Sequence, residues 1–226
     1  MTLGKPRTAV KGVLLDIDGT LVDTTYLHTV SWFESLRQDG HPVTMALIHR
    51  AVGMGSDKIL DYLLGPDHDA DDEVLTAGHS AIFGQYRERL TPLPGAADLL
   101  RKFHDLGLKV GLASSASAKD IKALRRALDA DDAITAVTGS ADAAHSKPDP
   151  DILLAALDRL SLTPADVVFI GDAIWDVKAA AALDIECIAL ESGGTSEAEL
   201  REAGAVAVYK DPADLLKQVS SSPIVW

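Results

Sequence analysis

The spacing of apolar residues changes character once along the chain, after a proline-rich segment at residues 91–95. From residue 96 onward, stretches with helical spacing alternate with short apolar runs typical of strands. Helices are expected at residues 96–106, 118–128, 151–160 and 174–183, strands at 108–113, 134–138, 166–170, 186–190 and 205–209, with two more short helices toward the C-terminus. Strands that alternate with helices form βαβ units, so this pattern predicts a parallel sheet covered by helices on both faces.

The part of the chain before this alternation combines one strand with a block of helices. Residues 11–16 form an apolar run that ends at Asp16 and an Asp-Gly turn, as expected of a buried strand. Residues 24–90 show helical patterns only, at 26–38, 46–52, 57–64 and 73–90. Because the first strand must join a sheet, we predict one α/β core made of residues 1–22 and 92–226. An all-helical insertion at residues 23–91 interrupts it.

Charge and cysteine content narrow the classes of function. The 226 residues include 34 Asp and Glu against 21 Lys and Arg, a formal charge of −13. Such a surface repels nucleic acid and anionic lipid, whereas small anionic substrates remain compatible with it. Cys187 is the single cysteine, the N-terminal apolar run is too short for a signal peptide, and no run reaches the roughly 18 residues of a membrane span. We therefore expect a cytoplasmic protein.

Reactive side chains follow the predicted strands of the core. Ligands of open parallel sheets bind beyond the carboxyl ends of the strands, so the residues directly after each strand are the candidates for a site. These candidates are Asp16, Asp18, Ser114, Ser115, Lys147 and Asp172. Three carboxylates at one edge of a sheet repel one another unless a cation lies between them. The pattern thus favours a metal site with phosphate-binding groups beside it.

Each of these residue types has a task in phosphoryl transfer. A few hard oxygen ligands favour Mg²⁺, which binds one or two carboxylates together with water and phosphate. Asp16 can attack phosphorus and form an aspartyl-phosphate. Asp18 can protonate the leaving oxygen and later deprotonate water, provided that it starts protonated near neutral pH. Ser114 lies near a predicted helix start that favours an anion, and Lys147 can neutralise the transferring phosphoryl group.

Four ordered motifs resemble those of the haloacid dehalogenase superfamily of phosphatases. They read DIDGTLVD at residues 16–23, LASS at 112–115, SKPDP at 146–150 and GDAIWD at 171–176. The resemblance covers nearly the whole chain and implies a Rossmann-like fold. The helical insertion stands where the subgroup similar to phosphoglycolate phosphatases and β-phosphoglucomutases has its helical cap.

The resemblance also implies roles for individual residues. Mg²⁺ would be bound by Asp16, by the backbone carbonyl of Asp18 and by Asp172. Asp176 would orient Lys147 or a metal-bound water, Thr20 would be a second accessory residue, and Ser115 would join Ser114 in binding phosphate. In the insertion, Gly53, Ser56 and Lys58 of the GMGSDK segment are candidates for holding the leaving group of the substrate. His28 could reach the site, but we expect it to be solvated or structurally hydrogen-bonded.

The leading hypothesis is an Mg²⁺-dependent phosphatase that transfers phosphate from a small phosphorylated metabolite to Asp16 and then to water. A sugar phosphomutase of the β-phosphoglucomutase kind, which returns the phosphate to a sugar, is the alternative within the enzymes. A non-catalytic binding protein that kept the fold is the alternative outside them. Dehalogenation is disfavoured because it needs neither an acid at position 18 nor a metal ligand at position 172. The sequence specifies neither the natural substrate nor the oligomeric state.

Overall fold

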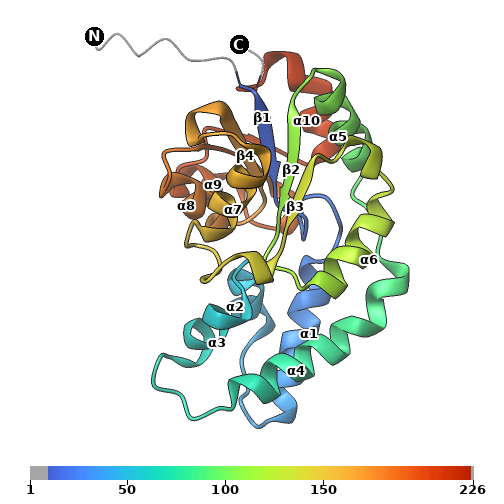
Figure 1. Ribbon diagram of the computed structural model, residues 1–226. Coiled ribbons are helices and arrows are strands. Elements are labelled where there is room, and N and C mark those ends of the chain that lie inside the picture. Colours follow the sequence, from blue (N-terminus) through green and yellow to red (C-terminus); the bar gives the residue numbers. More distant parts are fainter. Residues whose placement is uncertain (1–9, 225–226) are drawn as a thin grey trace, which may run out of the picture.

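A six-stranded parallel sheet forms the centre of the computed structural model, which describes residues 10–224 (Figure 1). The strands lie in the order β3-β2-β1-β4-β5-β6. Their bounds are Gly12–Leu15 for β1, Lys109–Ala113 for β2, Ala136–Thr138 for β3, Val167–Gly171 for β4, Glu186–Leu190 for β5 and Ala207–Tyr209 for β6. Each lies within, or one residue beyond, a segment predicted to be a strand.

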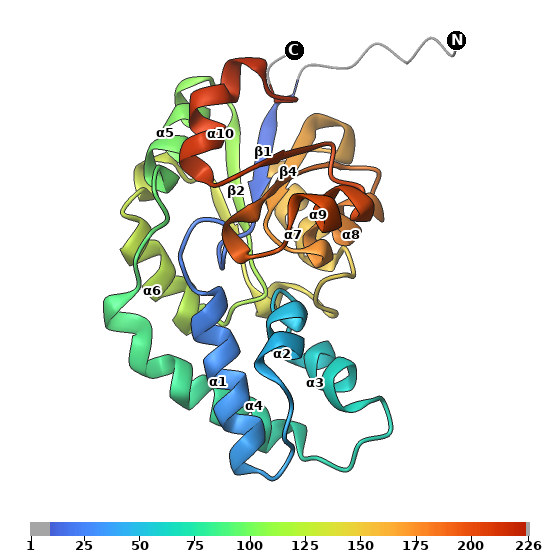
Figure 2. The ribbon, with the colours of Figure 1, turned by 180° about the vertical axis from the view of Figure 1, so that it is seen from behind.

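Helices cover both faces of this sheet. Figures 1 and 2 show α5 (Ala96–Asp105), α6 (Ala118–Leu128) and α10 (Pro212–Gln218) on one face, and α7 (Asp151–Leu160), α8 (Ile174–Ala181) and α9 (Glu197–Ala203) on the other. Successive residues of β1 point to opposite faces: Val13 and Leu15 pack into the cluster under α5, and Leu14 into the cluster under α7. The predicted α/β fold with helices on both faces is thereby confirmed.

The helices between β1 and α5 form a separate group at the carboxyl ends of the strands (Figure 1). They are α1 (Thr25–Gln38), α2 (Met45–Ala51), α3 (Ser56–Leu64), α4 (Asp72–Phe83) and the 3-10 helix η1 (Gly84–Arg89). A hydrophobic cluster of their own, which includes Trp32, Ile48 and Leu75, holds them together. The single helix predicted at 73–90 is wrong in one respect: the α-helix ends at Phe83, because Gly84 is a poor helix former.

Two chain segments join this helical group to the sheet, and they are hydrogen-bonded to each other. The backbone N–H of Asp23 donates to the carbonyl of Thr91 over 3.0 Å, and that of Leu93 donates to Leu21 over 2.8 Å. On this basis we propose the division into a core of residues 1–22 plus 92–226 and a helical cap of residues 23–91. Residues 1–9 of that core, including the N-terminal stretch considered as a signal peptide, and residues 225–226 lie outside the described part of the chain.

Short 3-10 helices complete the described residues. They are η2 (Asp131–Ala133), η3 (Ser140–Asp142), η4 (Pro164–Asp166), η5 (Glu191–Gly193) and η6 (Val219–Ser221). Within residues 10–224, no helix has both the length and the apolar character needed to cross a membrane.

Candidate active site

Three neighbouring strands in the middle of the sheet deliver the candidate site residues. Asp16 follows β1, Ser114 follows β2 and Asp172 follows β4, and β1 pairs with both of the other strands. The chain leaves β1 toward β2 and β3 on one side and resumes with β4 on the other. Ligands of open α/β sheets bind at such a switch in strand order. The sheet topology alone therefore brings these three residues to one edge, which we call the rim.

Lys147 lies buried between two carboxylates at this rim. Its side chain is 1% exposed, and its Nζ lies 2.7 Å from Oδ1 of Asp16 and 2.7 Å from Oδ1 of Asp176. Burial alone would lower the pKa of Lys147, but the two carboxylates raise it above its usual value. The lysine is thus held as an ammonium ion directly beside Asp16.

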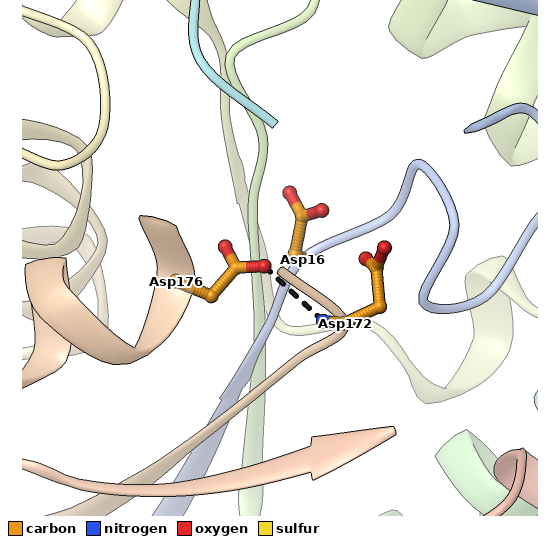
Figure 3. A group of neighbouring side chains, drawn as sticks. All are labelled: Asp16, Asp172 and Asp176. Carbon is orange, nitrogen blue, oxygen red and sulfur yellow. Dashed lines mark hydrogen bonds between the residues drawn. The ribbon is translucent and has the colours of Figure 1, made fainter. Parts of the chain in front are cut away.

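Asp176 uses both of its oxygens inside the rim. Oδ1 accepts the hydrogen bond from Lys147, and Oδ2 accepts the backbone N–H groups of Asp172, at 3.1 Å, and Ala173, at 3.0 Å. Figure 3 shows the bond to the backbone of Asp172 and the three carboxylates side by side. Asp176 therefore both orients Lys147 and fixes the start of α8.

The carboxylates of the rim fit a divalent cation. Asp16, Asp172 and Asp176 each place an oxygen within 4.8 Å of the others, and all three are buried. Burial raises the pKa of Asp16 to about 7, and burial together with Asp176 and Asp16 raises that of Asp172 well above its usual value. A cation among these groups would offset their repulsion. Both oxygens of Asp176 already accept hydrogen bonds from the protein.

The Asp-Gly turn after β1 brings the first motif against Asp172. Gly19 has φ +81°, and a Cβ at this position would lie 2.5 Å from Oδ2 of Asp172. The next residue, Thr20, donates a hydrogen bond of 2.6 Å to Oδ1 of the same carboxylate. A glycine is therefore required at position 19 for both conformation and space. Thr20 holds Asp172 in place.

Asp18 lies at the boundary between the rim and the helical cap. Thr24 Oγ1 donates to Oδ1 of Asp18 over 2.8 Å, His28 Nε2 lies 3.2 Å from the same oxygen, and Ser114 Oγ donates to Oδ2 over 3.3 Å. Burial alone would raise the pKa of Asp18, but the hydrogen bond and charge of His28, followed by Thr24, lower it below the usual value. The role inferred for Asp18 from the sequence requires that this residue start protonated. In the structure its ionised form is favoured instead, because of a contact with His28 that the sequence did not show.

The two serines after β2 differ in their surroundings. Ser114 is 1% exposed, and its Oγ also accepts the backbone N–H of Ala116 over 3.0 Å. The Oγ of Ser115 is buried and has no hydrogen-bond partner within residues 10–224. Both residues line the cavity described next, as does Lys147. Ser114 is thus fixed by the protein, while the hydroxyl of Ser115 is left available.

A cavity of about 190 Å³ lies between the rim and the cap. The rim contributes Asp16, Asp18, Ser114, Ser115 and Lys147, and the cap contributes Trp32, Gly53, Met54, Ile59, His79 and Ser80 among others. The sequence-predicted position of Gly53 at the cavity agrees with this lining. The structure differs from the prediction that Lys58 holds the leaving group. Lys58 is not among the residues that line the cavity, and its Nζ pairs instead with the carboxylate of Asp149 in the core.

Two histidines stack in the cap wall of the cavity. His28 Nδ1 lies 3.1 Å from His79 Nε2, and the two rings lie between Phe83 and Trp32, with centroids 4.0 Å apart for His28 and Phe83 and 4.2 Å for His79 and Trp32. Burial, followed by the charge of His28, lowers the pKa of His79 well below its usual value. Sequence reasoning missed His79, because its contact with His28 depends on the packing of α4 against α1.

Comparisons with known proteins agree with this geometry. A family model of haloacid dehalogenase-like hydrolases matches residues 10–184. The chain is 31% identical over 217 residues to a phosphoglycolate phosphatase of Rhodospirillum rubrum, which covers 91% of this chain and 89% of that protein. It is 32% identical over 173 residues to beta-phosphoglucomutase of Bacillus subtilis, 73% of this chain and 76% of that protein. A crystal structure of a hydrolase from Pseudomonas syringae has a TM-score of 0.88 at 33% identity, over 93% of this chain and 98% of that one.

The family match runs from the start of β1 to just beyond α8 and so contains the whole rim. The family match also includes the helical cap, and the structural match, which covers 93% of the chain, extends the likeness beyond residue 184. The resemblance inferred from four short motifs is confirmed, and the chain belongs to the haloacid dehalogenase-like hydrolases.

Proposed function

We propose that the protein is an Mg²⁺-dependent phosphatase that hydrolyses a small phosphorylated metabolite through an aspartyl-phosphate on Asp16. One observation carries the proposal. The Asp16 carboxylate lies 2.7 Å from the buried ammonium of Lys147 at the floor of a cavity of about 190 Å³. A nucleophile beside a fixed cation in a small cavity suits attack on a phosphate group, whose charge the cation neutralises in the transition state.

The residues of the rim divide the reaction between them. A carboxylate oxygen of Asp16 forms a bond to phosphorus while the bond between phosphorus and the leaving oxygen breaks. Lys147, Ser114 and Ser115, whose hydroxyl has no other partner in the described residues, hold the oxygens of the transferring group. In the second step, water attacks phosphorus, Asp18 accepts a proton from that water, and the carboxylate of Asp16 is released with inorganic phosphate.

Asp18 would also donate the proton that the leaving oxygen needs in the first step. In the described arrangement, His28 and Thr24 favour its ionised form. We infer that entry of the substrate replaces the contact with His28 that lowers the pKa of Asp18. Without this contact Asp18 takes up a proton from solvent, and it donates this proton to the leaving oxygen. His28 and Thr24 would then orient Asp18 before and after the chemical steps.

Asp16, the backbone carbonyl of Asp18 and Asp172 are the residues that would hold Mg²⁺. Thr20 and the backbone turn at Gly19 fix Asp172 in position for this role. When bound, the ion supplies positive charge that stabilises the phosphate and offsets the repulsion between the carboxylates.

The named relatives support a phosphatase and keep a phosphomutase as the second candidate. The Rhodospirillum rubrum relative is a phosphoglycolate phosphatase and the Bacillus subtilis relative a beta-phosphoglucomutase. A small cavity favours a small metabolite in either case. Isomerisation of a sugar phosphate in a coupled assay, activated by a sugar bisphosphate, would identify the mutase. A cytoplasmic location also stays a prediction.

The decisive test replaces the nucleophile. Asp16→Asn keeps the size of the side chain but removes the attacking oxygen, so phosphate release from p-nitrophenyl phosphate with Mg²⁺ should fall by roughly 10³-fold or more. Mass spectrometry of the wild-type protein quenched during turnover should show one added phosphoryl group, absent from the variant. Asp105→Asn, an exposed aspartate of α5, is the matched control. An unchanged rate in Asp16→Asn would refute the proposal, and a wild-type protein without Mg²⁺ binding or turnover would favour a non-catalytic role.

A further inference from the structure

The cap contacts the core on both sides of Lys147. The backbone N–H of Gly55 donates to Oγ of Ser146 over 2.9 Å, and the backbone N–H of Ser146 donates to Oδ2 of Asp57 over 3.0 Å. Two residues after Lys147, the carboxylate of Asp149 accepts the ammonium of Lys58. Three residues of one cap segment thus hold the residues that flank the buried lysine of the rim.

The approach of the two segments is close enough to require a glycine. A Cβ at Gly55 would lie 2.5 Å from Cβ and 2.8 Å from Oγ of Ser146. Any side chain at position 55 would therefore push the segments apart and break the hydrogen bond between them. The contact therefore depends on the close fit of Gly55 against Ser146 as well as on the ion pair between Lys58 and Asp149.

The bonds of the core alone position the lysine loop only in part. The backbone of this loop closes one turn, in which Asp149 N–H donates to the carbonyl of Ser146 over 3.0 Å. Just before the turn, His145 N–H donates to Oδ2 of Asp151, the first residue of α7, over 3.0 Å. Both ends of that turn, Ser146 and Asp149, are the residues that the cap holds. Because Lys147 lies inside the turn, a shift of either end moves its ammonium relative to Asp16.

Other contacts join the cap to the core without touching this turn. His49 Nε2 lies 2.8 Å from the carbonyl of Gly193, Trp175 Nε1 donates to the carbonyl of Arg50 over 2.9 Å, and Arg87 pairs with Asp120 at 2.6 Å. These contacts would keep the cap against the core if the contact at Ser146 and Asp149 were lost. The contact at the lysine loop can therefore be altered separately from closure of the cap.

We propose that Gly55, Asp57 and Lys58 form a clamp that sets the position of Lys147 when the cap is closed, so that Asp57 and Lys58 are positioning residues for phosphoryl transfer. The clamp rests on the proposed function, because its effect on catalysis requires that Lys147 neutralise the charge of the transferring phosphoryl group. It also gives Lys58 a role that differs from direct contact with the leaving group. Closure of the cap would complete the rim only when this clamp forms, which couples entry of the substrate to the position of the catalytic ammonium.

The kinetic test breaks the ion pair from either side. Lys58→Met and Asp149→Asn should each lower kcat for p-nitrophenyl phosphate by about tenfold with KM nearly unchanged, since small displacements of catalytic groups have effects of this order or larger. The double variant should be no slower than the slower single variant, because both changes break one contact. Lys58→Glu combined with Asp149→Lys should recover part of the loss. Arg101→Met with Asp132→Asn removes an ion pair on the core surface and should leave kcat unchanged.

A second measurement is independent of turnover. Amide hydrogen exchange of residues 143–150, followed by mass spectrometry, should be faster in Lys58→Met than in the wild type, and unchanged in the control. Kinetic losses that add up in the double variant, a wild-type kcat in both single variants, or unchanged exchange would each overturn the clamp. Absence of turnover in the wild type would instead refute the proposed function, while the exchange of residues 143–150 would still decide whether the clamp holds the loop.

Discussion

The rim of the sheet and the wall of the cap face each other across one cavity, yet they hold their polar groups in different ways. At the rim, Asp16 is 3% exposed, Lys147 1% and Asp176 0%, and the three are joined by short ion pairs. In the cap wall, Ser56 and Ser80 lie on exposed positions of helices that pack through a separate cluster. The difference indicates that the rim groups are held mainly by the sheet and by ion pairs among themselves, with the cap clamp adding the final position of Lys147, whereas Ser56 and Ser80 of the cap are free to contact a substrate.

Replacement of the rim ammonium should have the largest effect. Lys147→Met keeps the length of the side chain but leaves Asp16 and Asp176 without their shared cation. We expect kcat/KM for p-nitrophenyl phosphate to fall by roughly 10³-fold, the upper range for loss of one transition-state donor, and the thermal midpoint to fall because two buried carboxylates lose their partner. Lys119→Met, on the exposed start of α6, is the control. An activity within tenfold of the wild type would show that the rim does not depend on this cation.

Asp172→Asn should separate activity from stability. The amide removes a buried charge next to Asp16 and Asp176, so activity with Mg²⁺ should fall by about 10²-fold while the metal-free protein gains about 1 kcal/mol of unfolding free energy. Enzyme assays and urea denaturation in a chelator measure the two effects. Equal losses of activity and stability would contradict the assignment of Asp172 to metal binding.

The stability of the Asp172→Asn variant should also differ from that of the wild type in its dependence on pH. Since burial raises the folded-state pKa of Asp16 to about 7 from 3.8, the folded state binds more protons than the unfolded state between these values. The contribution of Asp16 to the stability of the metal-free wild type should therefore fall as the pH rises from about 4 to 7. Asp172, whose pKa is also raised, should add to this fall, and His79, whose pKa is lowered, should oppose it below pH 6.5. Asp172→Asn should reduce the slope, and saturating Mg²⁺ should oppose it.

Removal of the contact between His28 of the cap and Asp18 of the rim should have a smaller effect. His28→Phe keeps an aromatic ring against Phe83 but removes the hydrogen bond to Asp18. A hydrogen bond to a charged group contributes about 1.5 kcal/mol to holding Asp18 before and after the chemical steps, so kcat/KM should fall by at most about tenfold. The exposed His104 gives the control, His104→Phe. A loss as large as that of Lys147→Met would mean that the cap takes part in the chemistry as directly as the rim does.

The same contrast explains what could be predicted from the sequence. Asp16, Ser114 and Asp172 directly follow strands, and the alternation of helices and strands predicts a parallel sheet whose strands end at one edge, so local patterns sufficed to place these residues together. The direction of a cap side chain depends instead on how helices pack on one another and on the core. For this reason Lys58 was assigned to the leaving group although it pairs with Asp149, and His79 was missed.

The ionisation of Asp18 could not be predicted for a related reason. Thr24, which donates a hydrogen bond to Asp18, is only six residues away in the sequence. The decisive partner, His28, contacts Asp18 only because the first turns of α1 lie over the rim. A motif identifies the residue types of a site, while the pKa values depend on distances that only the folded chain shows.

The smallest effect should come from matched changes in the hydrophobic cluster of the cap and in the cluster of the core that lies under α5. Ile48→Val in the cap and Ile188→Val in β5 remove one methylene from positions that are both 0% exposed, and each should cost about 1 kcal/mol. If the cap is stabilised by its own cluster, Ile48→Val should speed amide exchange in α1–α4 alone, whereas Ile188→Val should affect the strands and lower the global stability. Both variants should keep kcat within about twofold, since neither side chain reaches the cavity. Uniformly faster exchange in both variants would show instead that cap and core unfold as one cooperative unit. The two regions would then differ only in how deeply their polar side chains are buried.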